Sequence, residues 1–440
     1  MIPIKYEIAP NLTVRVCQTE KLKAGMISLS VVLPIDREKT CLTSLLLSVL
    51  HRGTRTYPTI AHINRRLDYL FGTEMSVRNY YRGDRHIIGI AADLLGEEYL
   101  PDHNGRPLME DVLEVMCEIL FHPLLDEDGC LQTHYVESEK SLQCDAIRAL
   151  KNHPRAYAME HCSEILYQNE PCGVPIYGTE EQIASVTAEQ LTAHWRSLIE
   201  DLRLDCFYVG PDRGEVVCER IGRVFLSKIT DAEQERKSEH ADVHAFSGEV
   251  KRVEEELAVS QGQLVMGFCT DTTVRDDDYY ACVVANEMLG VSPISKLFVN
   301  VREKLGLCYH CSSHYNMYKG VVLITCGLHP KNRALAEREI MNQIDLLAKG
   351  DFSDTELFAA KQSLENAYRQ LEDSPTALEN YYLGRAVYGV DTTLAQCRER
   401  IASVTRADIL RVAARLRADT VYFLNGTALA DGEEAEDEAD

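Results

Sequence analysis

Apolar residues recur at helical spacing in two short stretches of the chain. In residues 41–50 they lie three or four positions apart, at Leu42, Leu45, Leu46, Val49 and Leu50. That spacing places them along one face of a helix, and Gly53 follows as a helix-ending residue. Residues 294–304 show the same period and are followed by Gly306. The pattern therefore predicts an amphipathic helix in each stretch.

Short apolar runs bounded by glycine or polar residues predict β-strands. The expected strands are residues 26–33, 73–81, 86–91, 263–269, 307–315 and 321–327. Each half of the chain opens with one strand, continues into a helix and then forms two adjacent strands. Long helices are expected at residues 131–150 and 354–372. Helices packed on mainly antiparallel sheets define an α+β fold, which is the predicted fold class.

A pentapeptide, Ile-Ala-Ser-Val-Thr, occurs twice in the chain. It occupies residues 183–187 and again residues 401–405, which lie 218 positions later. The threonine that ends each copy is a predicted N-cap, because its side-chain oxygen can accept hydrogen bonds from free amides of the next helix. Each predicted helix is followed by an apolar run that predicts a closing strand, at residues 206–209 and 421–424. The shared continuation favours an internal duplication.

The duplication divides the chain into two similar domains. At 440 residues the chain exceeds the roughly 250–300 residues that one hydrophobic core usually supports. We expect an N-terminal domain at residues 1–226, a polar linker at 227–250 and a C-terminal domain at 251–426. The remaining residues, 427–440, form an acidic tail that is expected to be disordered.

The charge of the chain excludes several classes of partner. It carries 46 basic and 69 acidic residues, a net charge of −23. Such a surface repels nucleic-acid phosphates and anionic membranes, so neither is an expected partner. No apolar run is long enough to predict a membrane-spanning helix, and the N-terminus lacks the pattern of a secretory signal. Fifteen scattered cysteines then indicate reduced thiols and a cytoplasmic protein.

Two motifs that resemble metal or redox sites are weak. Cys308 and Cys311 form a C-x-x-C, but a spacing of three residues in a regular strand places the two sulfurs on opposite faces. His240 and His244 have helical spacing, yet they lie in the polar linker and are expected to be solvated. No Walker A, G-x-G-x-x-G or G-x-S-x-G motif is apparent. We therefore expect neither a cofactor nor a bound metal.

Residues 301–309, VREKLGLCY, resemble the R-E-x-x-G-L-x-Y segment of the insulinase (M16) metallopeptidases. The preceding residues 286–290, NEMLG, and 295–298, SKLF, are also similar to that family. The resemblance extends from about residue 10 to Gly426 and includes the duplication. It implies two homologous α+β domains that face each other across an enclosed peptide-binding cavity.

The resemblance also shows what the first half has lost. The family carries H-x-x-E-H on the first helix of its N-terminal domain, where two histidines bind zinc and the glutamate is the general base. Here Ser44 and Ser48 stand at the histidine positions and Leu47 at the glutamate position. The third zinc ligand is a later glutamate, seven residues after an acid that Glu139 matches, and Ala146 occupies its place. Serine, leucine and alanine side chains cannot provide this zinc site, so the resemblance implies no catalytic residue on this chain alone.

Arg302 and Tyr309 match the arginine and tyrosine of the family segment. Taken alone, they are interpreted as a surface arginine and a sheet tyrosine, although one glycine turn could bring them together. The resemblance implies that they bind substrate backbone beside the zinc and stabilise the oxyanion. Some family members divide the work between a zinc subunit and a zinc-less subunit, as bacterial two-protein pairs do.

Two hypotheses follow. In the first, the chain is inactive by itself, pairs with a zinc-bearing M16 homologue in a hetero-oligomer and contributes Arg302 and Tyr309 to peptide binding and cleavage; in isolation it could form a homodimer. In the second, it is a peptidase-fold scaffold or interaction protein with no role in proteolysis. The sequence names neither the substrate nor the partner, and it leaves the oligomeric state open.

Overall fold

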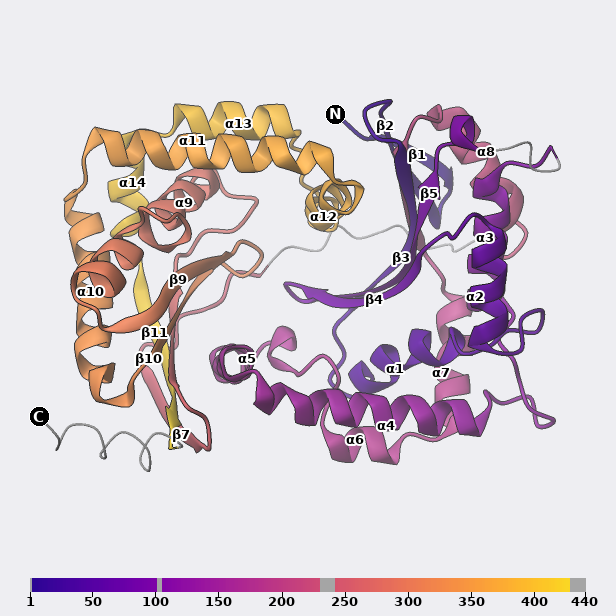
Figure 1. Ribbon diagram of the computed structural model, residues 1–440, viewed down its shortest axis with the longest axis horizontal. Helices are drawn as coiled ribbons and strands as arrows, with labels where there is room; N and C mark the ends of the chain where they lie inside the picture. The colour runs from indigo at the N-terminus through magenta and orange to yellow at the C-terminus, as the bar shows by residue number, and fades with distance from the viewer. Residues whose placement is uncertain (1, 101–104, 230–241, 428–440) are drawn as a thin grey trace, which may run out of the picture. The chain divides into compact units, whose positions relative to one another are not determined.

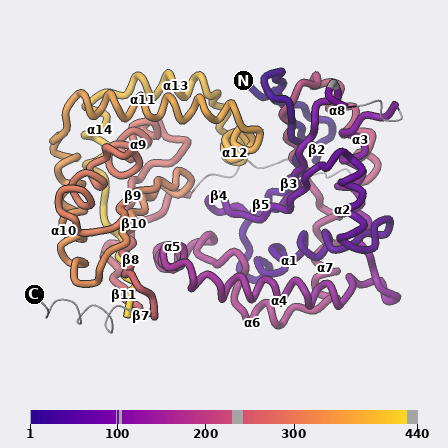
Figure 2. Tube along the Cα trace, in the orientation of Figure 1, coloured from indigo at the N-terminus to yellow at the C-terminus, as the bar shows by residue number. Residues whose placement is uncertain are grey.

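The computed structural model describes residues 2–100, 105–229 and 242–427. Within those ranges, no helix is both long enough and apolar enough to cross a membrane. The chain divides into two compact units. Unit 1 comprises Met1–Ile147, Val174–Glu239 and Gln370–Thr393, and unit 2 comprises Arg148–Gly173, His240–Arg369 and Leu394–Asp440. Each unit is built around its own β-sheet and is described by itself (Figures 1 and 2).

Unit 1 contains a six-stranded sheet in the order β1-β2-β6-β3-β5-β4. Its strands are β1 Ile4–Ala9, β2 Leu12–Gln18, β3 Ala24–Pro34, β4 Met75–Arg82, β5 Arg85–Leu95 and β6 Leu204–Gly210. Its helices are α1 Thr40–Leu50, α2 Ile60–Tyr69, α3 Leu108–Phe121, α4 Thr133–Ala149, α6 Glu180–Ser185, α7 Ala188–Glu200, α8 Gly214–Phe225 and α12 Pro375–Ala386. Alternation along β3 sends Ile27, Leu29 and Val31 into the main core of the unit, while Ser28 faces α12.

Unit 2 contains a five-stranded sheet in the order β7-β11-β8-β10-β9. Its strands are β7 Lys251–Leu257, β8 Gly262–Cys269, β9 Cys308–Asn316, β10 Val321–Leu328 and β11 Arg417–Gly426. Its helices are α5 Pro154–Leu166, α9 Tyr279–Asn286, α10 Arg333–Lys349, α11 Asp354–Gln370, α13 Leu394–Ser403 and α14 Arg406–Ala413, together with the π-helical segments η4 Glu287–Val291 and η5 Leu297–Lys304. Figure 1 shows α9, α10 and α14 on one side of this sheet and α5 on the other.

The two sheets share one topology. Apart from the additional edge strand β1, the order β2-β6-β3-β5-β4 of unit 1 is the order β7-β11-β8-β10-β9 of unit 2. In both sheets the first of these pairs is parallel and the others are antiparallel. The predicted α+β class is confirmed, and the common strand order agrees with the internal duplication that the repeated pentapeptide predicts.

The two repeats exchange a helix. α5 follows the long helix α4 in the first repeat, but it packs on β8 and β11 in unit 2. There its buried residues Tyr157, Cys162 and Leu166 share a core with Val265 and Leu323. α12 follows the corresponding helix α11 in the second repeat, but it packs on β3 and β6 in unit 1. Each sheet is therefore completed by a helix from the other repeat.

The helix termini follow the predicted chemistry. Thr187 begins α7 and Thr405 begins α14, and each accepts a hydrogen bond from the backbone amide three residues later. The side-chain oxygens of Gln190 and Asp408 in turn accept a hydrogen bond from the backbone amide of their threonine, which completes a capping box in both places. The predicted helix at residues 41–50 is also confirmed, as α1.

The predicted helix at residues 294–304 is partly wrong. Helical structure begins only at Leu297 and is of the wider π type. Ile294 and Leu305, which the pattern assigns to the apolar face, are 57% and 53% exposed.

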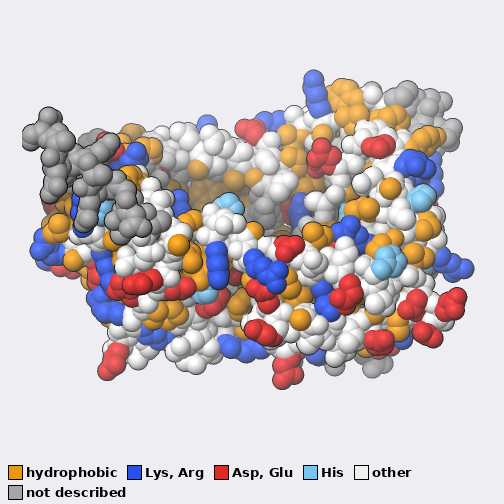
Figure 3. All heavy atoms as spheres, turned by 60° about the horizontal axis from the view of Figure 1, so that its bottom comes forward, with side chains coloured by type: hydrophobic (Ala, Val, Ile, Leu, Met, Phe, Trp, Pro, Cys, Tyr) orange, Lys and Arg blue, Asp and Glu red, His pale blue; other side chains and the backbone are white. Residues whose placement is uncertain are grey.

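The domain boundaries at residues 226, 250 and 426 stay predictions, because linker residues 230–241 and tail residues 428–440 lie outside the described residues. On the face drawn in Figure 3, acidic and basic side chains are intermixed.

A buried carboxylate fixes α12 on the sheet of unit 1, and its removal should destabilise that unit. Glu379 is 1% exposed, accepts a hydrogen bond from Ser28 and forms an ion pair with Arg78. Glu379→Ala should lower the free energy of unfolding by about 3 kcal/mol, because it leaves the arginine unpaired. Fluorescence of Trp195, the only tryptophan and part of unit 1, reports this unfolding in urea.

The control for this experiment is Asp373→Ala. Asp373 forms an ion pair with Lys21, but both side chains are more than half exposed, so its loss should cost less than about 1 kcal/mol. Equal effects of the two substitutions would show that the buried pair does not stabilise the docked helix.

Candidate functional site

The residues predicted to stand at the family's zinc-ligand and base positions lie on α1 and α4 of unit 1. Ser44 is 5% exposed, and its hydroxyl donates a hydrogen bond to the backbone carbonyl of Ile176. Leu47 is 3% exposed and belongs to the main core of the unit. Ser48 is half-buried and Ala146 is exposed on α4. The residues present do not fit a zinc ion, because the one buried hydroxyl is already used and the other positions offer no strong ligand.

The surroundings of α1 are those of a structural helix. Arg52, just beyond its end, forms an ion pair with Glu139 of α4. Thr43 hydrogen-bonds the Nε2 atom of His194 on α7 at 3.0 Å. Burial lowers the pKa of His194, so its imidazole is neutral at pH 7. Within the described part of the chain, no group of three metal-ligating side chains is found at this helix.

A glutamate placed at Leu47, the predicted position of the general base, should destabilise the protein. A carboxylate at this position would lie in the apolar core without a partner, so Leu47→Glu should lower the free energy of unfolding by about 3 kcal/mol or more. The matched control is Ser48→Glu on the same helix, at a half-buried position. Urea unfolding monitored through Trp195 separates the two variants. A Leu47→Glu protein as stable as the control would mean that this position is open to a solvated site.

Arg302 and Tyr309 lie on two irregular elements of unit 2. Arg302 belongs to the π-helical segment η5. Tyr309 is near the start of β9, where the pairing with β10 slips: His310 faces Gly327, whereas Cys308 faces Leu328. Tyr309 is therefore the extra residue of a β-bulge. π-helical turns and β-bulges are both over-represented at functional sites, where they redirect side chains.

A tight turn joins the two elements. The amide of Gly306 donates to the carbonyl of Arg302 at 3.0 Å, and the amide of Leu307 donates to the carbonyl of Val301 at 3.1 Å. Gly306 has a φ of +59°, a conformation that glycine adopts without steric cost. The helix end and the strand start are thus held close together by the glycine turn.

Both side chains keep most of their polar groups available. The Tyr309 residue is 56% exposed, and its hydroxyl makes no hydrogen bond within the described residues. The Arg302 side chain is 42% exposed and stacks over the ring of Phe298, with 4.6 Å between the guanidinium carbon and the ring centroid. Its Nε atom lies 3.5 Å from the Glu303 carboxylate. The stacking holds the guanidinium in place while its terminal nitrogens can still donate.

The bulge also overturns the expectation for the C-x-x-C motif. Cys311 pairs with Cys326 on β10, and Cys308 pairs with Leu328, two residues further along that strand. Cys308 and Cys311 therefore lie on the same face of the sheet, and the prediction of opposite faces is wrong. Hydrogen bonds from Cys311 and then from Cys326 lower the pKa of the Cys308 thiol, and the positive charge of Arg302 acts in the same direction.

Because the neighbouring thiols lower its pKa, we expect the Cys308 thiol to react below neutral pH. The thiolate is the nucleophile, and it persists down to the pKa of the group. At pH 6 we expect iodoacetamide to alkylate Cys308 faster than Cys130, which is also half-buried. Arg302→Ala should slow the reaction of Cys308 alone, because it removes a positive charge that favours the thiolate. Peptide mass spectrometry measures both rates. Equal rates at Cys308 and Cys130 would contradict the described hydrogen bonding.

His244 differs from its predicted state. Its position in the polar linker predicts a solvated imidazole, but the residue is 4% exposed. Its backbone amide donates to the carbonyl of Lys319 at 2.9 Å, and its ring Nδ1 is hydrogen-bonded to Glu170. The prediction is wrong because polarity along the chain does not reveal a tertiary contact with a distant turn.

Comparison with known proteins shows which family this chain is similar to. Residues 185–364 match the family profile described as Peptidase M16 inactive domain. A protein of Bacillus subtilis described as "Probable inactive metalloprotease YmfF" is 30% identical over 422 residues, which cover 95% of this chain and 96% of that protein. A second protein of the same bacterium, "Uncharacterized zinc protease YmxG", is 26% identical over 58% of this chain and 59% of its own length.

Solved structures agree with the fold. A conserved protein from Enterococcus faecalis superposes with a TM-score of 0.87 at 24% identity and covers 97% of this chain and 99% of its own. A Pseudomonas fluorescens structure described as a peptidase M16 inactive domain superposes with a TM-score of 0.79 at 15% identity, over 97% of this chain and 98% of its own.

Proposed function

The chain belongs to the M16 metallopeptidase family as an inactive M16-like member, and we propose that it is the non-catalytic subunit of a two-protein peptidase. In this role it pairs with a homologue that carries H-x-x-E-H and its zinc. Arg302 and Tyr309 then hold the substrate peptide against the partner's zinc. The observation that carries the proposal is the contrast between the residues of α1 at the predicted zinc and base positions and the pair Arg302 and Tyr309. Leu47 has become part of the core, whereas Arg302 and Tyr309 keep exposed donors on irregular elements.

The two retained side chains have chemistry suited to a peptide carbonyl. Arginine is always charged and presents several donors in a rigid fork. The tyrosine hydroxyl adds one directional donor beside it. Together they can hydrogen-bond the substrate backbone and the negative charge that develops on the carbonyl oxygen during attack. Ser44, Leu47, Ser48 and Ala146, which stand at the predicted zinc and base positions, supply neither a metal ligand nor a base, so we expect the chain alone to cleave nothing.

The relatives also support a partner of this kind. Bacillus subtilis contains both the probable inactive metalloprotease and the uncharacterized zinc protease to which this chain is similar. An inactive and a zinc-bearing homologue in one bacterium are the two components that the proposal requires. A homodimer of this chain would form only in the absence of that partner. The alternative function, a scaffold or interaction protein outside proteolysis, leaves Arg302 and Tyr309 dispensable.

Substitution of either donor should impair the mixed complex. Arg302→Ala and Tyr309→Phe should each reduce the rate of peptide cleavage by about 10²–10³, the usual effect of losing one oxyanion donor. The melting temperature should hardly change, because both side chains are exposed. The assay mixes each variant with the zinc-bearing homologue from the same organism and measures kcat/KM.

The matched controls are Arg338→Ala and Tyr99→Phe, at exposed positions outside η5 and β9. They should leave cleavage unchanged. If the Arg302 and Tyr309 variants cleave as fast as these controls, the scaffold function is favoured instead. A loss of cleavage that only follows a loss of binding to the homologue, seen in gel filtration, would give the pair an interface role rather than a role in substrate binding.

A further inference from the structure

We infer that His244, Cys269 and Asp419 of unit 2 form a binding site for one divalent transition-metal ion of the zinc class. The ring nitrogen, the sulfur and the carboxylate oxygen of these residues lie within 4.8 Å of one another. The three residues are 4%, 0% and 0% exposed. This site goes beyond the proposed peptidase role, because it lies neither at the lost zinc helix nor on η5 and β9.

Three separate segments bring the ligands together. Cys269 is the last residue of β8. Asp419 lies on the neighbouring strand β11, where the pairing with β8 slips between Ala418 and Thr420, so Asp419 is the extra residue of a bulge. Bulges re-aim side chains, and this one directs a carboxylate into the interior. His244 reaches the same point from the segment before β7 and is anchored by a hydrogen bond from its backbone amide to the carbonyl of Lys319.

The imidazole of His244 is oriented as in a metal site. Its Nδ1 is hydrogen-bonded to Glu170, which also forms an ion pair with the buried Lys319 at 2.6 Å. Its Nε2 is buried and makes no hydrogen bond within the described residues. A carboxylate on one ring nitrogen fixes the tautomer in which the other nitrogen can bind a metal. Few buried polar atoms in proteins lack a partner, so the Nε2 atom requires an explanation.

A metal ion explains the separation of His244 and Asp419 better than a hydrogen bond does. The Nε2 atom of His244 lies 3.6 Å from Oδ2 of Asp419, which is too long for a hydrogen bond. Two ligands of one tetrahedral zinc ion stand about 3.3–3.8 Å apart, given metal–ligand distances of about 2.0–2.3 Å. The Asp419 carboxylate is held by other donors, because Oδ2 accepts from the amide of Ser247 at 3.2 Å and Oδ1 accepts from the hydroxyl of Thr420 at 2.8 Å.

The ligand set selects the class of metal. A thiolate and an imidazole favour zinc, cobalt and similar ions over magnesium and calcium, which prefer oxygen ligands only. Three protein ligands leave one coordination position for water or another small ligand. His244 and Asp419 thus complement Cys269, which by itself would be an ordinary buried thiol.

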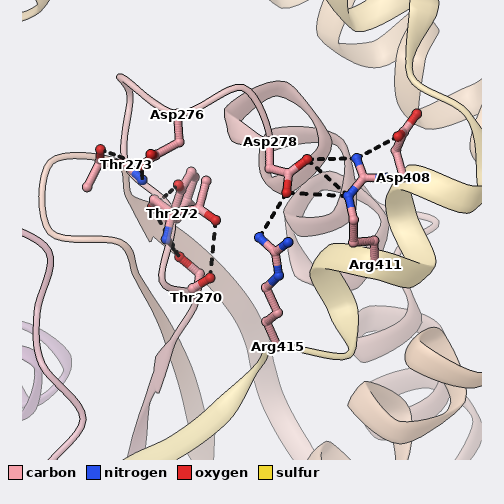
Figure 4. Close-up of polar contacts among 9 residues, drawn as sticks. Thr270, Thr272, Thr273, Asp276, Asp278, Asp408, Arg411 and Arg415 are labelled. Atoms are coloured by element: carbon pink, nitrogen blue, oxygen red, sulfur yellow. Dashed lines mark hydrogen bonds and ion pairs between the residues drawn. The ribbon is translucent and has the colours of Figure 1, made fainter.

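The loop after Cys269 is held rigidly, as Figure 4 shows. The Thr270 hydroxyl donates to the carbonyl of Gly320 at 2.9 Å and accepts from the amide of Thr272 at 3.2 Å. At the start of α9, Asp278 forms ion pairs with Arg411 at 2.7 Å and with Arg415 at 2.8 Å. Gly320 directly follows Lys319, the residue that anchors His244. One turn therefore fixes the approach of two ligands, and such preorganisation favours metal binding.

Cobalt(II) is the probe that tests this site in the full-length chain. Metal-free protein titrated with cobalt should bind about one equivalent and develop a thiolate-to-cobalt charge-transfer absorption. Cys269→Ser should abolish this absorption, and His244→Gln or Asp419→Asn should weaken binding at least about tenfold. Glu170→Gln, which alters the group behind His244 and removes the ion pair with Lys319, should weaken binding by about 10–100-fold.

The matched control is Cys326→Ser, which removes another fully buried thiol of the same sheet, next to Cys308 and Cys311. It should leave the cobalt spectrum unchanged. Circular dichroism establishes whether each variant folds. If a variant does not fold, its ligand is tested on the unmodified chain instead. X-ray absorption of that chain loaded with zinc gives the ligand set, which should contain about one sulfur together with nitrogen and oxygen.

Three results would overturn the inference. In the first, the unmodified chain binds neither cobalt nor zinc. In the second, the charge-transfer absorption persists in Cys269→Ser. In the third, this absorption disappears in Cys326→Ser. In the first case His244 is a structural residue held between Glu170 and Asp419. In the other two cases the metal binds elsewhere, with the thiols of β9 and β10 as the alternative for the last. None of these measurements requires a peptidase partner, so the proposed function is tested separately.

Discussion

The exchange of one helix between the two repeats is the constraint on which the fold depends. α12 brings Glu379 onto the sheet of unit 1, where Arg78 and Ser28 bind a carboxylate that is almost fully buried. α5 buries Tyr157 and Leu166 against the sheet of unit 2. A buried charge without its partners is costly, so α12 cannot leave unit 1 without a large loss of stability. Neither sheet is covered by its own repeat alone, and neither repeat is expected to fold well without the other.

The two groups of residues that resemble parts of the family site lie in different surroundings. At α1 the packing is that of an ordinary core, since Leu47 contributes to the hydrophobic core and Ser44 donates a hydrogen bond to a backbone carbonyl. In unit 2, Arg302 and Tyr309 lie on a π-helical segment and a bulge, irregular elements that are over-represented at functional sites. This contrast supports the proposal of a subunit that contacts a peptide without holding zinc at α1.

The sequence predicts regular elements well because their periodicity is local. The helix ending at Leu50 and the N-caps Thr187 and Thr405 follow from a few neighbouring residues. The helix exchange does not follow, because an apolar face predicts burial without saying which sheet covers it. The bulge that carries Tyr309 is missed for a related reason, since strand alternation assumes an unbroken register. His244 lies in a polar segment, and only its tertiary contacts bury it.

The central claim is that this chain supplies part of a peptidase site to a zinc-bearing homologue. Its most direct test is the rate of peptide cleavage by that homologue as the unmodified chain is added at increasing ratios. The account predicts negligible cleavage by either protein alone, a rate that rises with added chain, and a plateau at about one chain per homologue. A homologue that cleaves at its full rate without this chain, and whose rate does not respond to it, would contradict the account.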